Sequence, residues 1–233
     1  MYFRNLVFSA LAVAIIAGAC FSTYQMFFIT PLILDSEVYE ISGPVSSQIE
    51  AWSPADGTER DSWSFVSNLL VAFAYALILS SAMSLKSSVN MVKGVFWGGA
   101  AYLSIFVAPA IGLPPEIPGM EAAQLEGRQA WWFVTVVVTA LSLWLIAFYN
   151  IVQKVIGLIL MILPHVIGAP QPIEHGFVNP DPQAVLALNN LWHNFIIQTS
   201  IANALLWLII GAGTGYLVNR YVNTLDVLDT GKL

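Results

Sequence analysis

Six side chains in the 233-residue sequence are candidates for binding a cation. They combine one imidazole with five carboxylates, and they are His165, Glu116, Glu37, Glu40, Asp56 and Glu59. A borderline divalent ion such as Co²⁺ or Ni²⁺ accepts this mixture of nitrogen and oxygen donors. Glu37 and Glu40 would share a face only if their segment is helical. His165 could instead cap free carbonyls at the end of a helix. The spacing therefore permits a metal site without defining its ligands.

Other chemistries find little support in the sequence. It contains no Gly-x-Ser-x-Gly elbow, no His-Glu-x-x-His motif and no Cys-x-x-Cys pair, and its single cysteine, Cys20, excludes an internal disulfide. It also contains no phosphate loop, so any active transport would draw on a gradient or on another subunit. We expect a protein that is not an enzyme, requires no cofactor and has no nucleic-acid partner.

Closely spaced glycines mark two apolar segments. Gly211 and Gly215 belong to a Gly-Ala-Gly-Thr-Gly run that resembles a nucleotide fingerprint, but it lies in an apolar segment with no preceding strand. Gly94 and Gly98 form a similar pair. Small residues four positions apart let membrane helices approach closely, so we interpret all four glycines as helix-packing positions.

The segments that must position these residues are strongly apolar. Hydrophobic residues make up 58% of the chain and charged residues 9%, whereas about a quarter of an ordinary soluble domain is charged. Six runs are candidates for crossing the bilayer: 6–34, 63–85, 92–113, 131–152, 155–168 and 195–218. The fifth would give only about 21 Å of helix, so it could be re-entrant or only partly span. The sequence predicts an all-α integral membrane protein in which residues 1–233 form one transmembrane domain, a bundle of about six helices.

Basic residues favour one orientation of this bundle. With six spans and the N-terminus inside, the cytoplasmic side would hold Arg4, Lys86, Lys93, Lys154, Arg220 and Lys232, and the outer side only Arg60 and Arg128. If the fifth run did not cross, the split would be four against four. The positive-inside rule therefore predicts six spans, two cytoplasmic termini and longer outer loops.

Acidic residues are distributed even more unevenly. Twelve of the fourteen would face outward in this topology. They could simply supply polarity to loops that cannot be basic, or they could form an electronegative vestibule that concentrates cations. Within the spans, the amides of Gln25, Asn68 and Asn203 could bond between helices or offer oxygens to a dehydrating cation. No span carries a charge near its middle, which argues against an ordinary proton-driven pump.

Several longer strings resemble a known family. They are Phe3-Arg4-Asn5-Leu6, Pro31-Leu32-Ile33-Leu34 with Glu37-Val38-Tyr39-Glu40, Trp52-x-Pro54-Ala55-Asp56-Gly57-x-Glu59-Arg60, Gly112-Leu113-Pro114-Pro115-Glu116-x-Pro118-Gly119, Arg128-Gln129-x-Trp131-Trp132, and Pro164-His165-x-x-Gly168-Ala169-Pro170-x-Pro172. In this order, over nearly the whole chain, they resemble the CbtA family of predicted cobalt transporter subunits. Asp35 departs from the glutamate expected there, and Gln171 stands where a histidine sometimes follows in the family.

The resemblance implies a location, a partner and a cargo. It implies a subunit of the bacterial inner membrane that works with a small one-helix partner, CbtB, which carries most of the family's proposed metal-binding histidines. Co²⁺ would be the transported ion. The matching functional positions would be Glu37, Glu40, Asp56, Glu59, Glu116, Arg128 and His165.

Two alternatives remain open on the sequence. Arg128, with Trp131 and Trp132 at a span boundary, could pair with Glu116 or Glu126, or contact lipid headgroups or a partner. The whole chain could also be a non-transporting accessory subunit of a larger inner-membrane complex, since its glycine-lined helices and lack of an energy-coupling domain suit that role.

Overall fold

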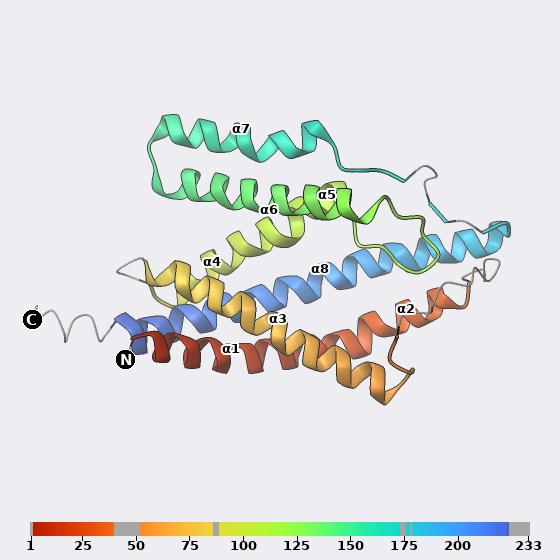
Figure 1. Ribbon diagram of the computed structural model, residues 1–233, viewed down its shortest axis with the longest axis horizontal. Helices are drawn as coiled ribbons and strands as arrows, with labels where there is room; N and C mark the ends of the chain where they lie inside the picture. The colour runs from red at the N-terminus through yellow and green to blue at the C-terminus, as the bar shows by residue number, and fades with distance from the viewer. Residues whose placement is uncertain (1, 40–51, 86–88, 173–175, 178, 224–233) are drawn as a thin grey trace, which may run out of the picture. The chain divides into compact units, whose positions relative to one another are not determined.

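The computed structural model describes residues 2–39, 52–85, 89–172, 176–177 and 179–223, and most of them are helical (Figure 1). The elements in order are α1 (Tyr2–Tyr24), η1 (Gln25–Ile29), α2 (Thr30–Glu37), α3 (Thr58–Ser84), α4 (Met91–Tyr102), η2 (Leu103–Val107), α5 (Ala108–Gly112), α6 (Leu125–Phe148), α7 (Ile151–Ile167), α8 (Pro182–Val218) and η3 (Asn219–Asn223). The elements labelled η are π-helical turns. The one β feature within the described ranges is an isolated antiparallel bridge between Met120 and Phe177.

Five helices are long and apolar enough to cross a membrane. Among the described residues these are Phe3–Glu37, Thr58–Ser84, Met91–Gly112, Leu125–Phe148 and Pro182–Tyr221, and the shorter apolar helix Ile151–Ile167 joins them. This agrees with the predicted all-helical membrane fold of about six apolar segments. A hydrophobic exterior is what lipid contact requires.

Helix boundaries differ from the predicted runs where local chemistry sets them. The side chain of Asn150 accepts hydrogen bonds from the backbone N–H groups of Val152 and Gln153, at 3.1 and 3.4 Å. This N-cap starts α7 at Ile151, four residues before the predicted start at 155. The predicted run 131–152 therefore extends four residues beyond the end of α6, which is at Phe148. At about 25 Å, α7 remains shorter than the roughly 30 Å hydrocarbon core.

Two of the prolines near the ends of apolar runs, Pro31 and Pro109, lie inside continuous helices. Pro31 and Pro109 each follow a π-helical turn by two residues, since η1 ends at Ile29 and η2 at Val107. Proline lacks the N–H that would bond to the residue four positions earlier, and a π-helical turn adjusts the bonding around that gap. The first helical segment therefore continues to Glu37, beyond the predicted end at 34.

The chain divides into two compact units. Unit 1 contains the described residues among 1–27, 51–99 and 202–233, and unit 2 those among 28–50 and 100–201.

In unit 1, α1 packs along α3, and α4 packs closely on α8. A Cβ built on Gly18 of α1 would lie 3.0 Å from the Cα of Leu69. The backbones of α4 and α8 approach even more closely, because a Cβ on Gly211 would lie 2.8 Å from the Cα of Gly98, and one on Gly215 would lie 2.8 Å from the Cα of Gly94. Each of these four glycines is buried. Glycine is required at this crossing because any side chain would displace backbone.

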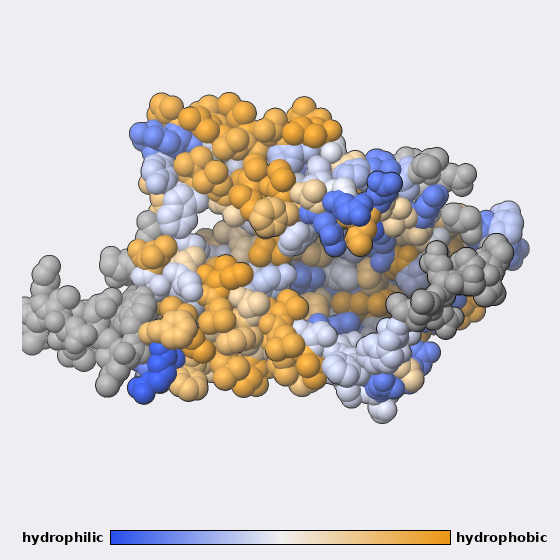
Figure 2. All heavy atoms as spheres, viewed as in Figure 1, coloured by the Kyte–Doolittle hydropathy of each residue, from blue (hydrophilic) through white to orange (hydrophobic). Residues whose placement is uncertain are grey.

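In unit 2, α6 packs against α5 and α7. A Cβ on Gly157 of α7 would lie 2.9 Å from the carbonyl oxygen of Ser142 on α6. The opposite side of α7 is lined by exposed aliphatic side chains, including Ile159, Ile162 and Val166. In Figure 2 hydrophobic side chains cover the visible face of α7. This face suits contact with lipid.

Candidate functional site

The predicted site residues fall in two clusters, one in each unit. The first, in unit 2, we call the motif junction. It consists of Gly112, Glu116, Arg128, Trp131, His165, Ala169 and Pro170. Its members come from the end of α5, the following loop, the start of α6 and the end of α7 with the segment beyond it.

An ion pair ties the loop of the motif junction to α6. Nη2 of Arg128 lies 2.6 Å from Oε2 of Glu116 and donates a hydrogen bond to it. Both side chains are about a quarter exposed, 27% for Arg128 and 26% for Glu116. A pair at this depth is screened less than a surface pair. Of the partners considered for Arg128, the structure therefore selects Glu116, while Glu126 is exposed.

Trp131 is the centre of the motif junction. Its indole Nε1 donates a hydrogen bond to the carbonyl oxygen of Pro164 at 3.3 Å, and its ring lies edge-on to the imidazole of His165 with 6.0 Å between centroids. A Cβ on Gly112 would lie 2.5 Å from Cη2 of Trp131 and 2.9 Å from the Cβ of Ala169. Trp131 thus packs against α5 and α7 at once. Trp132, its neighbour, is 38% exposed.

His165 does not cap its helix. Gly168 performs that role with a φ of +86°, and its N–H donates to the carbonyl of Pro164 at 3.0 Å. The imidazole is half-buried instead, and among the described residues its Nδ1 is buried with no hydrogen-bond partner.

The loop that carries Glu116 is held at several further points. The indole of Trp192 on α8 donates to the carbonyl of Pro115 at 2.8 Å. Ile117 is buried at 4% exposure, and Gly119 turns the chain with a φ of +84°. The bridge from Met120 to Phe177 follows, and Phe177 lies edge-on to Trp192 at 6.5 Å. Residues 113–120 therefore form an ordered loop with a defined position for the Glu116 carboxylate.

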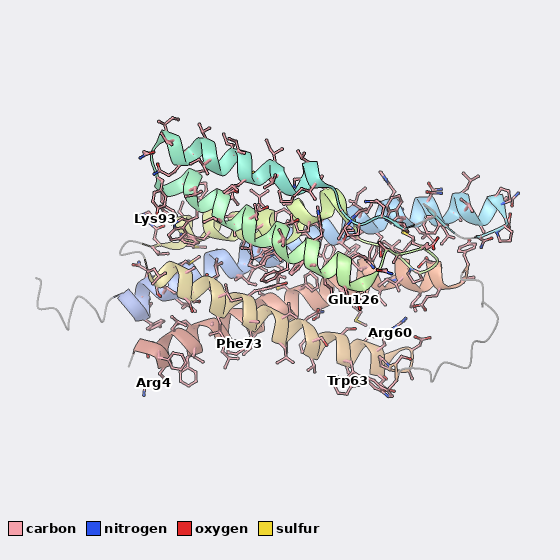
Figure 3. All side chains as sticks on the ribbon, turned by 45° about the horizontal axis from the view of Figure 1, so that its top comes forward. Arg4, Arg60, Trp63, Phe73, Lys93 and Glu126 are labelled. Carbon is pink, nitrogen blue, oxygen red and sulfur yellow. The ribbon has the colours of Figure 1, made fainter. Side chains whose placement is uncertain are left out.

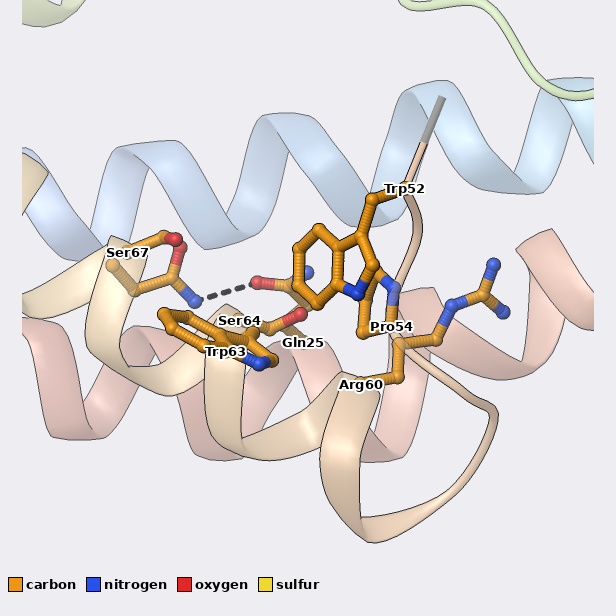
Figure 4. A pocket seen from close by; sticks show the side chains of 8 residues that line it. Gln25, Trp52, Pro54, Arg60, Trp63, Ser64 and Ser67 are labelled. Carbon is orange, nitrogen blue, oxygen red and sulfur yellow. Dashed lines mark hydrogen bonds between the residues drawn. The ribbon is translucent and has the colours of Figure 1, made fainter. Parts of the chain in front are cut away.

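The second cluster, in unit 1, is a pocket of about 410 Å³ that we call the tryptophan pocket. Its lining consists of Gln25, Trp52, Pro54, Arg60, Trp63, Ser64, Ser67 and Asn68. Trp52 and Trp63 form its aromatic walls, with ring centroids 5.8 Å apart and planes at 81° (Figure 4). Arg60 lies in the first turn of α3 and pairs with Asp56 at 3.2 Å.

Two amides form the polar part of the tryptophan pocket. Nδ2 of Asn68 donates to Oε1 of Gln25 at 2.7 Å and to Oγ of Ser22 at 3.1 Å. The dashed line in Figure 4 marks the bond that ends on the side chain of Gln25. These bonds join α3 to the end of α1, which is the interhelical role considered for both amides.

The remaining predicted residues take separate positions. Glu37 ends α2, and Glu40 lies outside the described residues. Asp56 and Glu59 are both exposed. Asp56 lies just before α3, and Glu59 lies in its first turn, where a carboxylate stabilises the positive end of the helix dipole. Within the described part of the chain, no group of three or more His, Cys, Asp or Glu side chains is arranged to hold a metal ion.

The part of the chain that holds both clusters matches a protein family. A family model described as CbtA, probable cobalt transporter subunit, matches residues 3–219. This chain belongs to the CbtA family. No curated protein and no solved structure matches it. Membership in CbtA, together with the apolar helices, makes the chain a multi-pass membrane protein of cobalt transport and a subunit that has a partner.

The structure shows what the CbtA strings do locally. The string around Glu116, the one that begins at Arg128 and the one around His165 meet in the motif junction, while the string from Trp52 to Arg60 lines the tryptophan pocket. Trp63 and Trp192 contribute to these clusters, although the sequence did not point to them as site residues. The available signal was the indole itself, because the N–H of a buried tryptophan usually finds a hydrogen-bond partner, as that of Trp192 does at the carbonyl of Pro115.

Proposed function

We propose that this chain is the membrane-spanning subunit of a cobalt importer in a bacterial inner membrane, with Co²⁺ as its cargo. The main support for this proposal is the match to the CbtA family over residues 3–219. Apart from the last two residues of the final helix, this range includes all five described helices that are long enough to cross a membrane. The partner in this proposal is a small one-helix subunit of the CbtB type.

The proposed orientation places both termini in the cytoplasm. Arg4 and Lys93 lie towards one end of unit 1, and Arg60 and Trp63 towards the other (Figure 3). With the first end inside, the segments 38–57, 113–124 and 168–181 are outer loops, and the short connections after α3 and α6 are cytoplasmic. The positive-inside rule supports this choice, because Arg4, Lys93 and Lys154 are then all inside.

In this orientation the motif junction and the mouth of the tryptophan pocket belong to the outer side. Exposed carboxylates there, such as those of Asp56 and Glu59, raise the local cation concentration. The candidate metal contacts are Glu37, Glu40, Asp56, Glu59, Glu116 and His165. We propose that they capture the ion together with donors of the partner rather than as a complete cage.

Uptake of ⁵⁷Co²⁺ tests the proposal in cells that lack other cobalt importers and express this chain with its small partner. We expect saturable uptake above the vector control, reduced several-fold by Glu116→Ala and by His165→Ala at equal protein amounts. Glu126→Ala is the matched control, because this exposed carboxylate is on the same side without the contacts of the motif junction. Absence of uptake by a correctly inserted wild-type pair would favour the accessory-subunit alternative instead.

A further inference from the structure

The tryptophan pocket is bordered by a polar face of α3. Four polar residues of this helix line it, and they are Arg60, Ser64, Ser67 and Asn68. Residues three, four, seven or eight positions apart share one face of a helix. At a rise of 1.5 Å per residue, this polar face is about 12 Å long and runs from the first turn of α3 into its apolar part. Apolar side chains of the same segment, such as Phe65 and Leu70, are exposed.

The length of α3 places its polar face at the boundary between hydrocarbon and lipid headgroups. The helix has 27 residues, which span about 40 Å, whereas the hydrocarbon core takes about 20 residues. Counted back from Ser84 at the inner boundary, the core begins near Ser64. Arg60 then lies about 6 Å above the core, at the level of the headgroups. The indoles of the pocket agree with this depth, because tryptophan is enriched at this boundary.

Hydrogen-bond donors line the pocket in an order that matches a phospholipid. The guanidinium of Arg60 is uppermost, and guanidinium groups bind phosphate by paired hydrogen bonds. The hydroxyls of Ser64 and Ser67 lie deeper, where the glycerol esters of a phospholipid present carbonyl oxygens as acceptors. The amide of Gln25 adds a donor, because its Oε1 accepts from Asn68 at 2.7 Å, which directs its NH₂ group away from Asn68.

An ion pair at the edge of the pocket favours a headgroup of zero net charge. Nη1 of Arg60 lies 3.2 Å from Oδ1 of Asp56, and the two side chains are 30% and 74% exposed. Asp56 precedes α3, so the carboxylate is both more exposed and farther from the apolar part of the helix. In Figure 4 the guanidinium of Arg60 extends away from the ring of Trp63, to the edge of the lining side chains. A headgroup with an inner phosphate and an outer ammonium complements this order of charges.

The cavity has the size and the access that a lipid requires. Its volume of about 410 Å³ is within the range of about 300–1,000 Å³ that is typical of ligand sites. Trp52 and Trp63 give it apolar walls for glycerol and the first methylene groups. These two side chains are 72% and 52% exposed, so a lipid can enter from the bilayer without passing through the protein.

We propose that the tryptophan pocket binds the headgroup and glycerol esters of one phosphatidylethanolamine molecule. Arg60 binds the phosphate, Asp56 binds the ammonium group, and Ser64 and Gln25 donate to the ester carbonyls. The proposal goes beyond the proposed function, because it requires a chain that lies in a bilayer and does not require cobalt transport.

Native mass spectrometry of the detergent-solubilised protein tests the pocket, with dioleoyl-phosphatidylethanolamine and dioleoyl-phosphatidylglycerol as probes in separate titrations. We expect one phosphatidylethanolamine to be retained several-fold more tightly than phosphatidylglycerol. Ser64→Leu fills the pocket and is expected to weaken retention several-fold. Ser62→Leu is the matched control, because the exposed Ser62 bonds to the carbonyl of Thr58 at 2.6 Å and is not a lining residue. Equal retention by wild type and folded Ser64→Leu would overturn the proposal.

Charge variants test the headgroup assignment and provide a second measurement if Ser64→Leu does not fold. Arg60→Gln is expected to weaken both lipids several-fold. Asp56→Asn is expected to weaken phosphatidylethanolamine alone, so that its advantage over phosphatidylglycerol is lost. A purely structural role of the ion pair would weaken both lipids equally in both variants, and that result would overturn the assignment.

A soluble competitor distinguishes a lipid from a free phosphate ester. Phosphoethanolamine carries the same charged groups without glycerol or acyl chains, so we expect it not to displace the bound lipid. Displacement would mean that the pocket takes a soluble phosphate ester and would overturn the lipid as its occupant. A wild-type pair that retains the lipid and takes up no ⁵⁷Co²⁺ would support this site and count against the proposed function, whereas cobalt uptake without selective lipid retention would do the reverse.

Discussion

At the scale of single residues, the Glu116–Arg128 ion pair shows how a candidate ligand can also be a structural contact. One oxygen of the carboxylate lies 2.6 Å from the guanidinium, so Glu116 links its loop to α6 whatever else it binds. A carboxylate with one occupied oxygen still has acceptor capacity for a second partner. Positioning by Arg128 and contact with a cation are therefore compatible.

Removal of either member of this pair is expected to destabilise the protein. Arg128→Ala leaves the Glu116 carboxylate without its partner at about a quarter exposure, which we expect to cost about 2 kcal/mol, between the values for exposed and fully buried pairs. Thermal unfolding of the detergent-solubilised protein measures the change. The exchanged variant Glu116→Arg with Arg128→Glu should recover part of the loss. Equal melting temperatures for Arg128→Ala, Glu126→Ala and wild type would mean that the pair contributes nothing.

A second prediction for a single residue concerns the stability that the side-chain amide of Asn68 provides. Asn68→Leu removes hydrogen bonds to Gln25 and Ser22, and at about 0.6 kcal/mol for each bond within a membrane we expect a loss of about 1 kcal/mol. The unfolding free energy of the reconstituted protein is the measurement. Asn189→Ala is the control, because the exposed Asn189 bonds only to Val185 of its own helix at 2.8 Å. The two variants should differ clearly, and similar values would show that the interhelical bonds are not stabilising.

At the scale of helices, prolines and glycines have roles that depend on their neighbours. Pro31 and Pro109 each follow a π-helical turn, whereas Pro164 lies inside α7 with no such turn before it. The carbonyls of Pro109 and Pro164 both accept the backbone N–H of the residue four positions later, Leu113 at 2.8 Å and Gly168 at 3.0 Å. The strings around Pro109 and Pro164 therefore end their helices with the same backbone bond and differ in the helical turn that precedes the proline.

The glycine crossing of α4 and α8 gives a sharp prediction at this scale. Gly211→Ala places a Cβ 2.8 Å from the Cα of Gly98, so the helices must separate, and we expect about 1–3 kcal/mol of destabilisation. Gly99→Ala is the matched control on α4, since nothing lies within 4 Å of its added Cβ. That control should be neutral or slightly stabilising, because alanine favours a helix by up to about 1 kcal/mol over glycine. Thermal unfolding compares them, and an equally tolerated Gly211→Ala would contradict the close approach.

At the scale of the whole molecule, α7 decides the topology. It is apolar and has 17 residues, fewer than any of the five helices that are long enough to cross a membrane. If α7 crosses, Arg220 is cytoplasmic with the other basic residues, and if it does not, α8 runs in the opposite direction. The proposed side for every outer loop residue after 167 depends on this one helix.

Reporter fusions test the topology. We expect alkaline phosphatase fused within 113–124 or 168–181 to be active, and a fluorescent protein fused after Leu233 to fluoresce, because the first folds only outside the cytoplasm and the second only within it. Fusion of each reporter at the α6–α7 connection provides the internal control, with fluorescence expected and phosphatase activity absent. A C-terminal fluorescent protein that does not fluoresce, together with an active phosphatase fused after Leu233, would mean that α7 does not cross.

Composition and apolar run length determined the class of this protein, because a segment that lies in lipid must satisfy its backbone internally and therefore forms a helix. The order of the helices, the close-packing glycines and the family strings were also present in the sequence. The partner of Arg128 was not, since Glu116 and Glu126 were equally available in sequence and only the turn of the loop brings one carboxylate to the guanidinium. The start of α7 depended on whether Asn150 would cap it, and the walls of the tryptophan pocket depended on two indoles that meet only after the chain folds.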